Sequence, residues 1–171
     1  MEQATPGDAS TLIYIAKADA FEEAVTCVGP IGAPPTVWSE SVEAGERIGA
    51  PEVTRIRAAA EMSLVRRESL DEELDDLATS VATEHRLGGG ESEVIALATR
   101  TGTALLDEGR ATRAAAALGI SVISTLFLPV VGLRSGRVDE ERAVTLLRRL
   151  APGTGATAAV VQTIEQHLRG E

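Results

Sequence analysis

Apolar residues along this chain follow two patterns, a helical spacing and short continuous runs. Between residues 12 and 25 they recur every three or four positions, as on one face of a helix. The same spacing, together with turn-forming residues, predicts helices over residues 12–25, 36–42, 51–60, 69–87, 91–101, 110–118, 125–133, 139–150 and 156–168. The short runs predict buried strands over residues 28–33, 62–67, 103–106 and 120–123.

Capping and breaking residues refine some of these boundaries. Ser69, followed by Glu72, has the spacing of a capping box and predicts that a helix starts there. Pro129 is compatible with a helix only in its first turn. The segment from Pro152 to Gly155 predicts a break between the last two helices.

Strands and helices alternate, which favours a parallel sheet covered by helices on both faces. Ligands of such sheets bind beyond the carboxyl ends of the strands. The length of 171 residues predicts a single domain over residues 1–171, with the last helix at its periphery. Because 44% of the residues are hydrophobic but only 2% aromatic, the core must consist of Ala, Val, Leu and Ile.

Charge and cysteine content exclude some functions. The formal net charge of −10 argues against tight, non-specific nucleic-acid binding, because phosphate contacts require Lys and Arg. Cys27 is the only cysteine, so an intramolecular disulfide is excluded, and its apolar neighbours predict a buried thiol. The N-terminus has no signal-peptide pattern and no apolar run approaches the roughly 18 residues of a membrane span, so we expect a cytoplasmic protein.

Four acids lie where predicted elements begin or end. Asp8 precedes a helix, Glu40 lies in the helix after Pro34-Pro35, Glu91 follows three glycines, and Asp107 ends an apolar strand. Acids at such points can meet at one edge of a sheet, where they need a cation between them. Each also has an ordinary explanation: Asp8 as a helix N-cap, Glu40 as solvated surface, and Glu91 as an acid favoured by the helix dipole. Asp107 has the weakest ordinary explanation.

Four motifs in order carry a resemblance to a known family. They are Asp8-Ala9-Ser10-Thr11-Leu12-Ile13-Tyr14-Ile15, Ala33-Pro34-Pro35-Thr36-Val37-Trp38-Ser39-Glu40, Leu87-Gly88-Gly89-Gly90-Glu91-Ser92-Glu93-Val94 and Leu105-Leu106-Asp107-Glu108-Gly109-Arg110, the last followed by the strand over residues 120–123. Together they resemble the PIN-domain family, and in particular a bacterial subgroup related to toxin nucleases. The likeness covers about residues 8–150.

The resemblance implies a three-layer α/β/α fold with a central parallel sheet, and cleavage of RNA that depends on Mg²⁺ or Mn²⁺. It assigns catalytic roles to Asp8, Glu40, Glu91 and Asp107, and metal binding to Asp8, Glu91 and Asp107. Ser10 and Glu108 match positions that support this cluster. The family has a buried strand before the first acid; here Pro6 and Gly7 predict that this strand is short or distorted.

Other polar and aromatic residues leave alternatives open. Arg110 and Arg113 follow the acids and either bind substrate phosphate or form surface ion pairs. Trp38 is expected to be a core or interface anchor rather than a base-stacking platform. Glu93 is expected to be solvated, and His85 and His167 to be surface residues.

Two functions are compatible with these features. The first is a metal-dependent endoribonuclease, which acts on RNA and serves as the toxin of a toxin–antitoxin pair with an antitoxin protein as partner. The second is a catalytically inactive PIN-like module that binds another protein. Self-association through Trp38 or the apolar residues 127–133 is a further hypothesis. If the acids do converge, Asp107→Asn should stabilise the metal-free protein by relieving charge repulsion.

Overall fold

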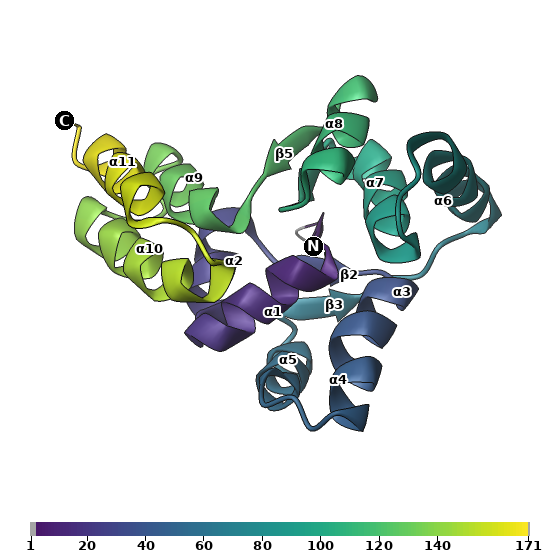
Figure 1. The fold of residues 1–171 in the computed structure, drawn as a ribbon, viewed down its shortest axis with the longest axis horizontal. Coiled ribbons are helices and arrows are strands. Elements are labelled where there is room, and N and C mark those ends of the chain that lie inside the picture. Colours follow the sequence, from purple (N-terminus) through teal and green to yellow (C-terminus); the bar gives the residue numbers. More distant parts are fainter. Residues whose placement is uncertain (1–2, 171) are drawn as a thin grey trace.

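The computed structural model describes residues 3–170 and consists of short parallel strands surrounded by helices (Figure 1). Strands β1 (Thr5–Pro6), β2 (Ile31–Ala33) and β3 (Val65–Arg67) form one parallel sheet, and β4 (Thr103–Leu105) and β5 (Ser121–Ile123) form another. A parallel bridge between Gly7 and Leu105 joins the two. The strands therefore lie in the order β3-β2-β1-β4-β5, and their carboxyl ends share one edge.

The strand β1 explains why the sheet is divided. In a parallel strand, alternate residues direct their N–H groups to opposite neighbours. Thr5 and Gly7 donate to Pro30 and Gly32 on the β2 side, at 2.8 and 2.9 Å. Pro6 falls on the β4 side and has no N–H to donate, so only Asp8 bonds Leu105 there, at 3.1 Å. The prediction that the first strand is short is confirmed. Pro6 removes one hydrogen bond between β1 and β4, and the bridge between Gly7 and Leu105 still joins the two sheets.

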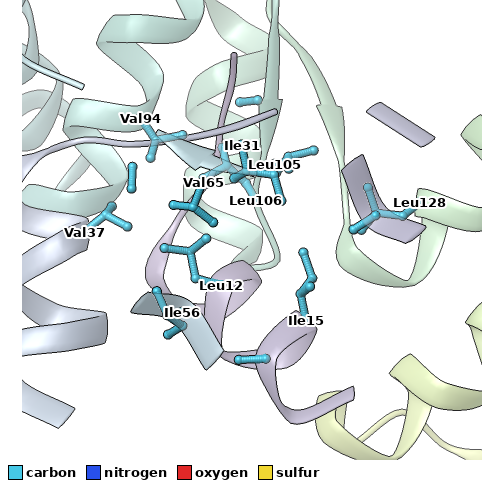
Figure 2. Close-up of a cluster of buried hydrophobic side chains, with 14 of the residues drawn as sticks. Leu12, Ile15, Ile31, Val37, Ile56, Val65, Val94, Leu105, Leu106 and Leu128 are labelled. Carbon is cyan, nitrogen blue, oxygen red and sulfur yellow. The ribbon is translucent and has the colours of Figure 1, made fainter. Parts of the chain in front are cut away.

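Helices cover both faces of the strands. They are α1 (Ala9–Ala18), α2 (Phe21–Val28), α3 (Pro35–Trp38), the π-helical turn η1 (Ser39–Glu43), α4 (Ala44–Arg47), α5 (Glu52–Glu61), α6 (Glu72–His85), α7 (Gly89–Thr101), α8 (Gly109–Ala117), the 3₁₀ turn η2 (Thr125–Phe127), α9 (Leu128–Arg134), α10 (Glu140–Thr154) and α11 (Ala158–Leu168). Figure 2 shows Leu12 and Ile56 on one side of the strand residues Ile31 and Val65, with Val94 on the other. This α/β/α arrangement confirms the predicted fold class.

The core is aliphatic, as the composition predicts. Its largest fully buried side chains are leucines, isoleucines and valines. Trp38 is buried at its margin, with the guanidinium groups of Arg67 and Arg57 at 4.9 and 6.0 Å from the ring centroid, so it is a core residue. Cys27 is buried as predicted, and burial raises the pKa of its thiol to about 11.

Several predicted boundaries are wrong: for example, β2 starts at Ile31 rather than Val28, and the helical segment after Pro34 continues to Arg47. Three others concern turn-forming and capping residues. The helix predicted over residues 12–25 is two helices, because Asp19 adopts a left-handed conformation (φ 52°) that ends α1. The N-cap of α6 is Asp71, whose carboxylate accepts from Leu74 N at 3.0 Å, and not Ser69. Pro152 does not break α10, which continues to Thr154 and ends at Gly155.

The C-terminal part packs as a small unit beside the main core. Helix α11 lies against α10 and α9 around a separate apolar cluster, which consists of Val130, Ala143, Val144, Leu147, Ile164 and Leu168. Pro129 lies in the first turn of α9 as predicted, and most of the apolar run 127–133 is core or partly buried, although Phe127 is exposed. Among residues 3–170, no helix has the length and apolar character needed to cross a membrane.

Candidate active site

Asp8 lies at the point where β1 passes into α1. Its backbone N–H bonds Leu105 of β4, and its Oδ1 accepts from Thr11 N at 2.8 Å, which makes it the N-cap of α1. The side chain is almost completely buried, at 4% exposure. Burial raises the pKa of Asp8 from 3.8 to about 6; the negative charge of Asp107 adds to the rise, and the hydrogen bonds from Thr11 oppose it.

Asp107 lies two residues after the end of β4 and is held from two neighbouring elements. Its Oδ1 accepts from Thr125 N at 2.9 Å, and its Oδ2 accepts from Thr125 Oγ1 at 2.5 Å and Thr11 Oγ1 at 3.3 Å. Its own N–H donates to Oδ2 of Asp8 at 3.4 Å. The two aspartates and two threonines therefore form one hydrogen-bonded network at the carboxyl ends of β1, β4 and β5.

Glu40 approaches the same edge from the helical layer after β2. It lies in the π-helical turn η1, a wider helical geometry that frequently marks functional sites. Its carboxylate packs on Gly90, where an added Cβ would lie 2.8 Å from Oε2. Loss of surrounding water raises the pKa of Glu40, and the negative charges of Glu91 and Glu93 raise it further, although the side chain keeps contact with solvent.

Glu91 lies in the first turn of α7 and faces its own helix end. Its Oε2 accepts from Gly88 N at 3.2 Å, which satisfies a backbone donor at the helix N-terminus. The residue is half-buried. Glu91 therefore combines its predicted site position with the ordinary capping role that the sequence also allowed.

A cleft of about 150 Å³ brings three of the four predicted acids together with Ser10. It is lined by Asp8, Ala9, Ser10, Glu40, Gly88, Gly90 and Glu91. Asp107 does not line the cleft; it lies directly behind Asp8, to which its backbone is bonded. A larger hollow of about 540 Å³ between α2 and α10 contains none of these acids.

The remaining predicted residues lie outside the cleft lining. Glu108 is the exposed N-cap of α8 and makes no side-chain capping bond. Arg110 donates from Nη1 to the backbone oxygen of Arg86 at 3.0 Å, and Arg113 is exposed one turn further along α8. Neither histidine of the chain lines the cleft: His85 ends α6, and His167 bonds Arg134 near the C-terminus.

Glu93 does not have the solvated position that the sequence predicts, and that prediction is wrong. Its Oε2 accepts from Thr36 N at 2.8 Å and its Oε1 accepts from Thr36 Oγ1 at 2.6 Å. The contact fastens α7 to the N-terminus of α3, the helix that leads into Glu40. Glycines make this close approach feasible, since a Cβ on Gly89 would lie 3.2 Å from Thr36 Cγ2.

Thr11 and Thr125 are site residues that the sequence did not indicate, although Thr125 has a detectable signal. It comes immediately after β5 and Ser124, at the same kind of strand end that identified Asp107. Both threonines are completely or almost completely buried and make hydrogen bonds to Asp107. They hold the acid in place and do not line the cleft themselves.

The donor chemistry of this edge fits a hard divalent cation. All side-chain donors at the cleft are oxygens, which Mg²⁺ and Mn²⁺ prefer. The pKa values of Asp8 and Glu40 are raised mainly by burial, and neighbouring carboxylates add to the rise. The spacing is looser than that chemistry requires: within residues 3–170, no three Asp, Glu, His or Cys side chains are grouped closely enough to hold one metal ion. Each acid is instead occupied by a local hydrogen bond or packing contact.

Fold and site define an α/β/α protein with an acidic cleft at the carboxyl ends of a parallel sheet. A family model described as a PIN domain matches residues 7–159, and the chain belongs to the PIN-domain family. PIN domains are generally nucleases and typically use divalent metal ions. No curated protein and no solved structure matches the chain.

Proposed function

We propose that the protein is a metal-dependent endoribonuclease that hydrolyses RNA phosphodiester bonds. The observation that supports this most strongly is the joining of Asp8 and Asp107 by a hydrogen bond at the strand ends, with Glu40 and Glu91 across the same cleft, in a PIN-domain chain. Asp8, Glu91 and Asp107 would hold Mg²⁺ or Mn²⁺. The bound ion would offset charge on the scissile phosphate and lower the pKa of a water molecule.

The protein's own residues supply positioning and proton transfer. Thr11 and Thr125 fix both oxygens of Asp107, so its orientation is set before substrate arrives. Glu40 is the proton acceptor in this proposal, because its raised pKa makes it more basic than an ordinary glutamate. Ser10, exposed at the cleft, offers a hydroxyl to a phosphate oxygen.

The reaction follows from these roles. The oxygen of a water molecule bonds to phosphorus as Glu40 takes its proton, and the bond from phosphorus to the 3′ oxygen breaks. The departing 3′ oxygen takes up a proton from solvent. The products carry 5′-phosphate and 3′-hydroxyl ends. Because both histidines lie away from the cleft, we expect no cyclic phosphate from histidine-assisted attack by a ribose hydroxyl.

The loose grouping of the acids favours a second candidate, an inactive PIN-like module that binds another protein. In the described part of the chain the acids do not form a compact metal cluster, and the net charge of −10 is unfavourable for RNA. A toxin of a toxin–antitoxin pair would combine both features, since it cleaves RNA and is held by an antitoxin. We place this role in the cytoplasm, with self-association as an additional property to be tested.

Cleavage of a labelled RNA by purified protein tests the proposal. Wild type should cleave with Mg²⁺ or Mn²⁺ and stop when EDTA is added, and Asp107→Asn should be inactive under all conditions. Asp139→Asn is the matched control: Asp139 is an exposed N-cap of α10, and asparagine caps equally well. Activity that persists in EDTA, or that Asp107→Asn retains, would contradict the nuclease proposal and favour the inactive module.

A further inference from the structure

Many basic side chains in the described structure are paired with an acid. Ion pairs join Lys17 to Glu52, Arg55 to Asp19, Arg57 to Glu46, Arg100 to Asp71, Arg148 to Glu165, Arg149 to Glu23 and Arg169 to Glu140. Seven arginines have no ion pair with an acid of residues 3–170, and three of them, Arg86, Arg110 and Arg113, lie together: Arg110 bonds Arg86, and Arg113 follows Arg110 on α8. The others are Arg47, Arg67, Arg134 and Arg142. In a chain of net charge −10, three exposed cations without acidic partners in one region form a local positive surface.

This surface borders the acidic cleft at Gly88. Arg86 ends α6 in a left-handed conformation (φ 54°), and Gly88, two residues later, lines the cleft. Nη1 of Arg110, from the first turn of α8, donates to the backbone oxygen of Arg86 at 3.0 Å. The bond holds the Arg110 guanidinium beside the end of α6 and leaves its other N–H groups available.

The same surface reaches the Asp107 end through Arg113. A Cβ on Gly109 would lie 3.4 Å from Nη1 of Arg113, so the guanidinium lies back over the start of α8. Gly109 is two residues after Asp107. The three arginines therefore extend along the end of α6 and the start of α8, from the cleft at Gly88 toward Asp107 behind it. Helices α6 and α8 contact each other and α7 (Figure 1).

We propose that Arg86, Arg110 and Arg113, here called the arginine rim, bind successive phosphates of a single RNA strand and direct it into the cleft. This inference rests on the proposed nuclease function for the identity of the strand. Arginine presents several N–H donors to phosphate oxygens, and a cleft of about 150 Å³ is narrow for a duplex. The rim offsets the unfavourable net charge, because phosphate is bound locally while the rest of the surface repels it.

The salt dependence of RNA binding tests the rim. Fluorescence anisotropy of a fluorescein-labelled oligouridylate, in EDTA to prevent cleavage, gives the affinity at several salt concentrations. The slope of log affinity against log salt should fall by about 0.7 for each phosphate that is no longer bound, so by roughly 2 in the variant with all three arginines changed to Gln. Arg148→Gln is the control, because Arg148 pairs with Glu165 on the distant α10–α11 unit and should leave the slope unchanged.

Single-arginine variants distinguish a loss of RNA binding from a loss of folding. Arg110→Gln removes the bond to Arg86, whereas Arg113→Gln removes no hydrogen bond or ion pair within residues 3–170 and should still weaken binding several-fold. With Mg²⁺ present, the same variants should raise KM and leave kcat nearly unchanged.

The outcomes of the rim and of the nuclease proposal are distinguishable. An unchanged slope in the triple variant overturns the rim, even if wild type cleaves RNA. A reduced slope in a protein that never cleaves RNA supports the rim and contradicts the nuclease. If polyglutamate binds with the same dependence on the arginines and oligouridylate does not, the rim is a site for an acidic protein segment and the proposal is wrong.

Discussion

The two sides of the acidic cleft are built in different ways. On the sheet side, Asp8 lines the cleft and Asp107 lies behind it. Each comes two residues after a strand, and hydrogen bonds from Thr11, Thr125 and the Asp107 backbone hold them. On the helix side, Glu40 and Glu91 extend from helical turns on longer side chains. Glu91 is turned toward Gly88, and Glu40 rests against Gly90.

This difference suggests a division of labour. The sheet side is fixed before any ligand arrives. The raised pKa of Asp8 reflects the free-energy cost of burying a charged carboxylate there. The helix side is adjustable, because a glutamate can exchange a capping bond for another partner by rotating its side chain. In the described residues the acids form no compact three-acid cluster, and Asp107 lies behind the cleft that the other three line. A cation would draw the two sides together.

The largest effect should come from breaking the sheet side at Asp107. Asp107→Asn removes a charge at the end of the network, and we expect RNA cleavage to fall by at least about 10³-fold, since metal-assisted charge stabilisation supplies several kcal/mol. Single-turnover cleavage in Mn²⁺ measures this. A loss of less than about tenfold would mean that the sheet side is not the fixed part of the site.

The free energy of unfolding should reveal the cost of burying the Asp8 carboxylate. Asp8→Asn keeps an oxygen for the Thr11 N–H and removes a charge whose pKa is raised from 3.8 to about 6, but it loses the acceptor of the Asp107 N–H. Metal-free protein should therefore be stabilised at pH 7 by up to about 3 kcal/mol, less the cost of that long hydrogen bond. A carboxyl group whose pKa is higher in the folded than in the unfolded state stabilises the fold fully at pH values below its unfolded-state pKa. This stabilisation is lost as the pH rises through its folded-state pKa. The gain from Asp8→Asn should therefore grow between about pH 4 and 6 and vanish below.

Urea unfolding at pH 4 and pH 7 checks this pH dependence, and equal gains in stability at both pH values would contradict it.

The structure therefore indicates that Asp8→Asn, rather than Asp107→Asn, stabilises the metal-free protein. Asp107 accepts hydrogen bonds from Thr125 N, Thr125 Oγ1 and Thr11 Oγ1, so Asp107→Asn disturbs a satisfied acceptor, and we expect little or no gain from it.

Variants of Glu93 test whether the helix side depends on the contact that positions Glu40. Glu93→Ala leaves Thr36 without its acceptor and should cost about 1–3 kcal/mol of stability, and it should lower cleavage by about 10–100-fold because Glu40 loses its support. Glu93→Gln retains an acceptor oxygen and should lose much less. Glu84→Gln, on the exposed surface of α6, is the control. Equal losses in the Ala and Gln variants would show that charge, not positioning, is the role of Glu93.

The smallest effect is expected from Gly90→Ala, which should displace the Glu40 carboxylate without a large loss of folding stability. A Cβ there would lie 2.8 Å from Oε2 of Glu40, so Gly90→Ala should displace that carboxylate and lower cleavage by about tenfold. The stability should change little, because the gain of about 0.5–1 kcal/mol that alanine brings to a helix is offset by a tight contact at 3.2 Å with the buried Val37 Cγ2. Gly153→Ala in α10, where the nearest atom lies 3.4 Å away, is the matched control. A large loss of stability in Gly90→Ala would mean that the backbone moved instead of Glu40.

All four acids have a local signal in the sequence. Asp107 ends an apolar run and Asp8 precedes one, and such patterns depend only on local order. The same rule applied to Ser124-Thr125 would have found Thr125. Glu93 has no such signal, since it resembles any acid near the start of a helix and its role depends on Thr36, far away in sequence.

Helix boundaries failed for local reasons. The apolar spacing continues past Asp19, so periodicity could not detect a turn that the left-handed conformation of one residue creates. The π-helical turn at Glu40 has no signal in the residue preferences of the segment, and its carboxylate packs against Gly90 of α7. Pro152 was expected to break a helix, but it lies in the last turn of α10, where little of the helix remains to be disturbed.

The position of a bound metal ion tests the central claim most directly. Crystals grown with Mn²⁺ should show one anomalous peak in the cleft, in contact with oxygens of Asp8 or Asp107 from the sheet side and Glu91 from the helix side. The Glu91 carboxylate should have left Gly88. A peak elsewhere on the molecule, or a cleft that stays free of Mn²⁺ at saturating concentration with Glu91 still on Gly88, would contradict the account.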